Sequence, residues 1–203
     1  MKVVFLLVDD PVGTPPAQVM VQTVRKHIPN AELIQLTGEH DEVVPGCTAQ
    51  RIPRNGMPLM MYRMLHLVQM PEPEFIVLDT DIWVQHDLSK VFAFPFDVAL
   101  TWREGPVYET ADKDKTTDLA KLMPYNSGVM LSRDKRFWCD CYKALERFDD
   151  IEIQNWYGDQ LSVANVAPHY NVLKLHCDNW NYTPGKEAED VSTRLCVPYK
   201  GRR

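Results

Sequence analysis

Two aspartates one residue apart, Asp79 and Asp81, directly follow the apolar run FIVL. In an extended chain, side chains at positions i and i+2 point to the same face, so both carboxylates could contact one cation while Thr80 points away. Carboxylates are hard oxygen ligands of the kind that Mg²⁺ and Mn²⁺ prefer, and such cations usually complete their shell with water and substrate phosphates. The spacing therefore predicts a Mn²⁺ or Mg²⁺ site with Asp79 and Asp81 as metal ligands and a diphosphate as the bound group. Asp79, Thr80 and Asp81 are together candidates for contacts with the donor that carries this diphosphate.

The Asp-x-Asp pattern is short and needs support from its surroundings. A second example, Asp112 and Asp114, lies in the polar run ADKDKTTD and is typical of a solvated loop. The first pair instead follows an apolar run that we interpret as a central strand, and open α/β sheets bind ligands at the carboxyl ends of their strands. Its position favours the metal site over plain strand-end carboxylates.

The elements that would position this pair begin with a β-α-β unit. Residues 3–8 are continuously apolar and predict a strand buried on both faces. A helix is expected from Pro15, with Thr14 as its cap, and a second strand over 32–36. The unit lacks a Gly-x-Gly-x-x-Gly fingerprint, which disfavours a dinucleotide site. Val8, Asp9 and Asp10, at the end of the first strand, are candidates for contacts with a nucleoside, although the two aspartates could equally cap the loop.

A helix over about residues 58–70 is apolar nearly all round and should be buried. Arg63 interrupts it, and because a buried arginine is costly unless it is paired, we expect a carboxylate partner near the active site. His66 is more simply an ordinary core or surface histidine than a catalytic one. Residues 37–56 look irregular.

Further strands are predicted over 97–101, 126–132 and 172–175, and helices after Asp134 and over 155–166. Asp159 would lie near the start of the last helix, where a carboxylate also complements the helix dipole. Residues 102–125 show no period, and we interpret them as a lid loop over the site.

Composition limits the classes of function. The chain has 203 residues, 45% hydrophobic and 25% charged, which is ordinary for one globular domain. Its net charge of −6 disfavours nucleic acid as a partner. The five cysteines fit no zinc pattern and predict reduced thiols. Neither a signal peptide nor a run long enough for a transmembrane segment is evident, so we expect a cytoplasmic protein.

Four segments carry a resemblance to a known family. FIVLDTDIWV, DLSKVF, YNSGVMLSRD and YGDQLSVAN, in this order, are similar to segments of the GT-A glycosyltransferases related to glycogenin and the bacterial lipopolysaccharide galactosyltransferases. The resemblance spans most of the chain. It implies an α/β, single-domain GT-A (Rossmann-like) fold over residues 1–203, with a mixed, mostly parallel sheet flanked by helices. It also implies a nucleotide-sugar donor, commonly a UDP-sugar, bridged by Mn²⁺ to the aspartate pair, and transfer with retention of configuration.

Individual positions follow from the same resemblance. It implies that Asp79 also contacts the ribose and that Arg63 lies near the donor sugar. The remaining matched positions are Asn126 and Ser127, which would face the donor sugar, Asp159, which would bind sugar hydroxyls, and Gln160, which would lie beside the anomeric carbon. Asp159, Gln160 and Asn126 are thus the implied catalytic residues. Leu161 replaces the third residue of the family's Asp-Gln-Asp motif.

The end of the chain departs from the family pattern His-x-x-Gly-x-x-Lys, whose histidine binds the metal and whose lysine contacts the diphosphate. Pro198 occupies the histidine position here, and Lys200, Arg202 or Arg203 would have to supply the positive charge. Metal binding would then depend on two aspartates with water and phosphate, or on His176, or catalysis would be weak.

Two other functions compete with glycosyl transfer. A sugar nucleotidyltransferase would also use a carboxylate-bound metal, but it needs a glycine-rich loop with a basic residue after the first strand, and DDPVGTPP has one glycine and no lysine or arginine. A nucleotide-sugar-binding module without turnover would fit Pro198. The acceptor stays open between glycan, lipid-linked saccharide, protein and modified base.

Overall fold

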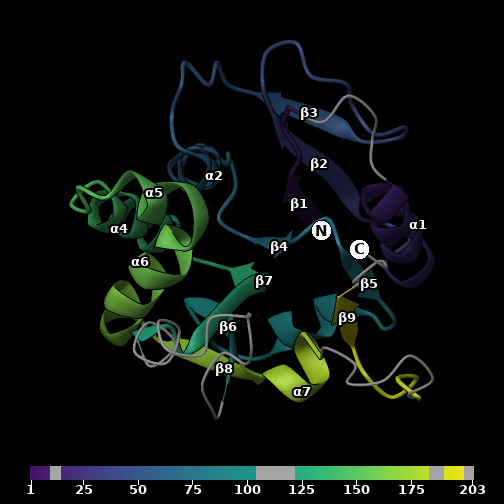
Figure 1. Cartoon of the computed structure of the whole chain (residues 1–203). Helices are drawn as coiled ribbons and strands as arrows, with labels where there is room; N and C mark the ends of the chain where they lie inside the picture. The colour runs from purple at the N-terminus through teal and green to yellow at the C-terminus, as the bar shows by residue number, and fades with distance from the viewer. Residues whose placement is uncertain (10–14, 104–121, 183–189, 199–203) are drawn as a thin grey trace.

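A mixed seven-stranded sheet forms the centre of the computed structural model, which describes residues 1–9, 15–103, 122–182 and 190–198 (Figure 1). In spatial order the strands are β3 (Thr48–Arg51), β2 (Glu32–Thr37), β1 (Lys2–Leu6), β4 (Phe75–Leu78), β7 (Tyr125–Ser132), β6 (Val98–Trp102) and β8 (Val172–His176). Within this sheet β7 runs antiparallel to both of its neighbours, and the other pairings are parallel. The expected α/β class with a mixed, mostly parallel sheet is confirmed.

Helices pack against both faces of the sheet (Figure 1). Their bounds are α1 (Pro15–His27), α2 (Leu59–Val68), α4 (Lys135–Leu145), α5 (Ile151–Trp156), α6 (Gly158–Val166) and α7 (Cys177–Trp180), with 3₁₀ turns η1 (Leu88–Ala93) and η2 (Ala167–His169). The helix α1 shares one buried cluster with Val3 and Phe5 of β1. The helices α2, α4 and α6 share another cluster with Val4. Alternate residues of β1 thus enter opposite layers, as its continuously apolar sequence predicts.

Local sequence signals explain several element boundaries. Asp134 caps α4 as expected, because its side chain accepts a hydrogen bond from the backbone N–H of Arg136 at 2.9 Å. Pro15 begins α1 as predicted. Phe137, Trp138, Cys141 and Leu145 of α4 are fully buried, and the partly buried Tyr142 packs against the same cluster, so this apolar face serves as core packing.

The structure corrects several expected boundaries. The segment 37–56, expected to be irregular, contains β3, and the strand expected over 3–8 ends at Leu6. The helix expected over 155–166 is two helices, α5 and α6, which meet at Tyr157. A second sheet was not anticipated: β5 (Ile82–Val84) pairs antiparallel with β9 (Cys196–Pro198).

The proposed lid at 102–125 falls mostly outside the described residues, which resume at Leu122. Among the helices that the structure describes, none combines the length and hydropathy that crossing a bilayer would require.

Candidate active site

Candidate residues gather at the edge of the sheet where the parallel strands have their carboxyl ends. The chain connections from β1 lead to β2 on one side and, later, to β4 on the other, so β1 and β4 flank the point where the strand order reverses. Open α/β sheets bind ligands at such a point. Asp9 follows β1 and Asp79 follows β4, while Asn126 and Ser127 lie at the start of the antiparallel β7 and reach the same edge.

Arg63, on α2, connects the end of β4 with β7 and α6. Its Nη2 donates to Asp79 Oδ1 at 2.8 Å and to the Ser127 carbonyl at 3.0 Å. Its Nη1 donates to Asp159 Oδ2 at 2.9 Å. The expectation that this arginine pairs with a carboxylate is confirmed, and the partners are two of the predicted site residues.

The Arg63–Asp159 ion pair is almost completely removed from solvent, with exposures of 5% and 1%. Burial disfavours both charged groups, but the two carboxylates outweigh burial at Arg63 and raise the pKa of the guanidinium. At Asp159, burial raises the pKa of the carboxyl group, and Arg63 opposes that shift. Asp159 Oδ1 also accepts from the backbone N–H of Gln160 at 2.8 Å, so the carboxylate is held at both oxygens. Asp159 therefore lies in the first turn of α6, as predicted, and also pairs with Arg63.

The half-buried Asn126 is held by a buried amide that the sequence did not single out, Asn181. Asn126 Oδ1 accepts from the Gly128 N–H at 2.7 Å and from Asn181 Nδ2 at 2.5 Å. A Cβ added to Gly128 would lie 2.7 Å from Asn181 Nδ2, 3.0 Å from Asn126 Oδ1 and 3.2 Å from Asp79 Oδ2. Three polar side chains therefore converge over the bare backbone of Gly128. The last segment that carries the family resemblance, YGDQLSVAN, ends at Asn165, so no sequence pattern pointed to Asn181.

Some buried polar atoms at this edge have no hydrogen-bond partner among the described residues. They are Arg63 Nε, Gln160 Oε1 and Asn181 Oδ1. An unpaired buried polar atom costs about 1–3 kcal/mol, so such atoms usually bind water or a ligand. Their concentration around Asp159 and Asn126 is the arrangement expected of a site for a polar ligand.

The aspartate pair itself does not lie on an extended strand, which corrects the argument used to predict it. The Ile82 N–H donates to the Asp79 carbonyl at 3.2 Å, so Asp79, Thr80, Asp81 and Ile82 form a turn between β4 and β5. The three residues before Ile82 are all half-buried. The apolar runs on both sides predict the two strands. The turn between them contains no glycine or proline that would have indicated it in the sequence.

The residues present fit a divalent cation only as a two-ligand site. Asp79 and Asp81 supply hard carboxylate oxygens, which suit Mg²⁺ or Mn²⁺ completed by water and phosphate. Asp79 Oδ1 already accepts from Arg63. In the described part of the chain, no group of three or more histidine, cysteine, aspartate or glutamate side chains could enclose a metal. Pro198 pairs with Ile82, next to Asp81, and offers no side-chain ligand there.

Only some of the remaining predicted donor contacts lie among the described residues. Asp9 pairs with Arg54, a partner that no sequence pattern indicated. The backbone of Asp9 has a positive φ of 57°. Val8 is half-buried directly before it. Asp10 and Lys200 lie outside the described residues. Asp9 thus lies at the predicted edge, with its carboxylate held by a neighbouring loop.

His66 differs from the satisfied histidine that was expected. It is fully buried in the core beside the edge of Tyr62, with ring centroids 4.5 Å apart. Neither ring nitrogen has a hydrogen-bond partner within the described ranges. Burial lowers its pKa from 6.5 to about 4, so the ring is neutral at pH 7.

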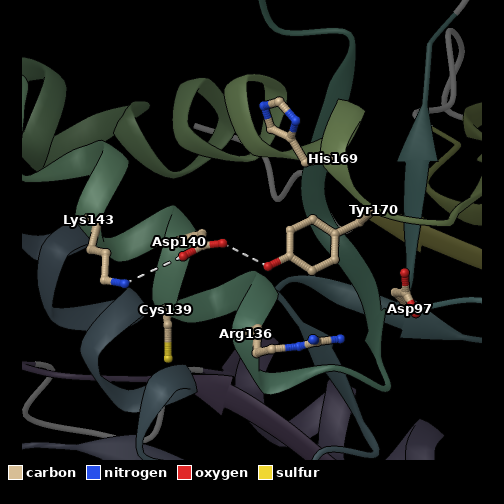
Figure 2. Close-up of a pocket in the computed structure, with 7 residues that line it drawn as sticks. All are labelled: Asp97, Arg136, Cys139, Asp140, Lys143, His169 and Tyr170. Atoms are coloured by element: carbon tan, nitrogen blue, oxygen red, sulfur yellow. Dashed lines mark hydrogen bonds and ion pairs between the residues drawn. The ribbon is translucent and has the colours of Figure 1, made fainter.

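Two cavities of about 540 and 560 Å³ adjoin each other along α4, away from this cluster. Figure 2 shows the first, where Asp140 accepts from Tyr170 and contacts Lys143. Asp97 and Tyr170 precede β6 and β8, so this cavity lies at the amino ends of those strands. It is therefore at the opposite edge of the sheet from Asp79 and Asn126.

Comparison with known proteins identifies the fold. No protein-family model matches the sequence, and no curated protein matches it. Among solved structures, the galactosyltransferase LgtC in complex with donor and acceptor sugar analogues aligns with 99% of this chain and 87% of its own, at a TM-score of 0.66 and 14% identity. The glycosyltransferase GlyE of Streptococcus pneumoniae TIGR4 aligns with 99% of this chain and 55% of its own, at 0.65 and 14%. The bifunctional glycosyltransferase WbbM aligns with 99% and 46%, at 0.62 and 13%. The chain therefore has the GT-A type fold that the sequence resemblance implied.

Proposed function

We propose that this protein is a metal-dependent glycosyltransferase that moves a hexose from a nucleotide-diphosphate donor, most simply a UDP-sugar, to an acceptor hydroxyl. The observation that carries the proposal is the buried Arg63–Asp159 ion pair, which Arg63 extends to the half-exposed Asp79, with Asn126 alongside it. It lies at the switch point of a sheet whose fold is shared with LgtC and GlyE.

Charge supports a cation in the donor site. Asp79 and Asp159 place two carboxylates against the guanidinium of Arg63, so these three side chains together carry a formal charge of −1. A diphosphate is itself an anion and would be repelled by this excess. A Mn²⁺ or Mg²⁺ ion held by Asp79 and Asp81 would offset this negative charge and, when bound, would stabilise the leaving diphosphate as a Lewis acid.

The buried polar groups suit the sugar. Asp159 accepts bonds through both oxygens and is held by Arg63 and by the N–H of Gln160, so it is placed to orient hydroxyl groups rather than to attack as a free nucleophile. Gln160 Oε1 and Asn126 would contact the sugar beside it. We propose transfer with retention, as the family resemblance implies, and the restraint on Asp159 then favours attack on the face that the diphosphate leaves over a covalent intermediate. NMR of the product anomer would distinguish retention from inversion.

Thermal unfolding with nucleotides tests the donor site. UDP, GDP and their common sugar conjugates are titrated with Mn²⁺ and with EDTA, on the wild type, Asp81→Ala and the exposed control Asp149→Ala. Ligand at about 100 times its Kd stabilises the native state by about 2.7 kcal/mol, which corresponds to a rise of several degrees. We expect a Mn²⁺-dependent rise with one nucleotide, present in the control and lost in Asp81→Ala. If no nucleotide raises the midpoint of thermal unfolding, either with Mn²⁺ or with EDTA, the proposed donor site is wrong.

A binding module without turnover is the second candidate, because Pro198 occupies the strand position beside the aspartate turn. It predicts donor affinity without cleavage of the sugar–phosphate bond. Incubation of the protein with the selected donor and Mn²⁺, followed by measurement of released nucleotide with and without candidate saccharide acceptors, separates the two. Release above the Asp81→Ala background supports the enzyme.

A further inference from the structure

We propose that Asn181 is part of the donor-sugar subsite: its Nδ2 orients Asn126, and its Oδ1 accepts a hydrogen bond from one hydroxyl of the sugar. The inference rests on the proposed function, because a sugar must occupy this edge of the sheet. It adds a residue outside all four segments that carry the family resemblance.

The orientation of both amides follows from one backbone group. The Gly128 N–H can only donate, so the Asn126 atom 2.7 Å away must be the carbonyl oxygen Oδ1. Asn181 approaches that same oxygen at 2.5 Å and must therefore present its NH₂ group. The direction of Asn181 Oδ1 is then fixed as well.

This leaves a buried acceptor without a partner. Asn181 is 3% exposed, and its Oδ1 contacts no donor in the described part of the chain. A carbonyl oxygen requires an O–H or N–H donor, and a sugar offers O–H groups on every side. The same amide lies beside Asp79 Oδ2 over Gly128, so a group bound there would be next to the aspartate turn.

The surrounding structure holds Asn181 in place without using its Oδ1. Its backbone N–H donates to the Cys177 carbonyl at 2.9 Å, and the next residue, Tyr182, donates to the Cys196 carbonyl at 3.2 Å. The helix α7 is thereby fixed between β8 and the β5–β9 pair. Because the backbone is anchored independently, the side chain is available for a ligand, and its replacement should spare the fold.

The test compares a nucleotide with and without its sugar. Calorimetric titration with UDP, UDP-glucose and UDP-galactose in Mn²⁺ is carried out on the wild type, Asn181→Ala, Asn181→Ser and the control Asn179→Ala, an exposed asparagine of the same helix. We expect Asn181→Ala to weaken the preferred UDP-sugar by about tenfold while the affinity for UDP stays unchanged. Asn181→Ser should fall between Asn181→Ala and the wild type, and Asn179→Ala should behave as the wild type.

Titration with monodeoxy donor analogues identifies the sugar hydroxyl that donates to Asn181 Oδ1. This part of the test can be made on the wild-type protein. The wild type should lose affinity for one analogue of the series, and Asn181→Ala should bind that analogue and the parent sugar equally well. Equal loss of UDP and UDP-sugar in Asn181→Ala, unchanged binding of both, or a wild type indifferent to every deoxy position would overturn the Asn181 assignment alone. A wild type that binds no nucleotide or nucleotide-sugar would instead overturn the proposed function, and this inference with it.

Discussion

Arg63 shows how a single residue can connect sequence and site. Its charge within an otherwise apolar helix predicted a buried partner, and the structure supplies Asp79 and Asp159. Removal of one member of a buried ion pair leaves an uncompensated charge, which typically costs about 3–5 kcal/mol. We therefore expect Arg63→Leu to lower the free energy of unfolding by that amount, as measured by urea denaturation.

The matched control is Arg136→Leu, because Arg136 pairs with Asp134 at the surface with 82% of its side chain exposed. A surface pair contributes about 1 kcal/mol or less, so this variant should stay close to the wild type. Adding Asp159→Asn to Arg63→Leu should recover part of the lost stability by removing the unpaired charge. Equal costs for the two arginine variants would show that Arg63 is not held as a buried ion pair.

The buried His66 makes the free energy of unfolding depend on pH, and the sign of the effect follows from the shift of its pKa. Burial lowers its pKa from 6.5 to about 4, so between these values the unfolded chain binds a proton that the folded chain does not. Acidification therefore favours unfolding. The part of the unfolding free energy that depends on a neutral His66 is fully present above pH 6.5 and is lost as the pH falls through about 4. The loss amounts to about 3 kcal/mol at pH 4.

We expect His66→Leu to remove this part of the pH dependence. Urea denaturation at pH 4 to 8 measures it as the difference between variant and wild type, which cancels the carboxylates common to both. His40→Gln, at an exposed histidine, should keep the slope of the wild type. A pH dependence that is unchanged in His66→Leu would mean that folding does not lower the pKa of this imidazole.

At the scale of the element, α2 owes its position to a contact from far along the chain. Its N-cap residue, Pro58, provides no side-chain hydrogen bond, and Asn155 Oδ1, from α5, accepts from the Leu59 N–H at 2.9 Å instead. Loss of a helix cap costs about 1 kcal/mol. Asn155→Ala should therefore lower the unfolding free energy by about this amount in urea denaturation, and Asn165→Ala, at an exposed position of α6, should change it by less than about 0.5 kcal/mol. If the two variants are equally stable, the cap contributes nothing.

The elements also show how far sequence patterns reach. Strands β1 and β4 were predicted because burial on both faces requires continuous apolar runs, and α2 because its apolar residues nearly surround it. Strand β3, with the sequence TAQR, is mostly exposed, and β9 has only three residues, so neither leaves a hydrophobic pattern. Within the site, Arg63 and the aspartates were found through charge in apolar surroundings. Asn181 and Arg54 were missed because their partners, Asn126 and Asp9, lie 55 and 45 residues away.

At the scale of the whole molecule, both helical layers depend on the same sheet. Met20 of α1 and Met64 of α2 are each fully buried, in the clusters on the two opposite faces. Neither layer can separate without exposing the apolar faces of β1 and β4, so unfolding should be a single cooperative transition. Such a transition is what the expectation of one domain requires.

Calorimetry of Met20→Ala and Met64→Ala tests this dependence. Truncation of a buried methionine to alanine costs about 2–5 kcal/mol, so each variant should unfold at a lower temperature, while Gln22→Ala, on the exposed side of α1, should match the wild type. Because the layers share the sheet, each core variant should shift the entire heat-capacity peak and keep the calorimetric and van't Hoff enthalpies equal. If Met20→Ala instead split the peak and left a component at the wild-type temperature, the α1 layer would unfold separately from the layer that carries Arg63. The candidate site would then depend on α2, α4 and α6 alone for its stability.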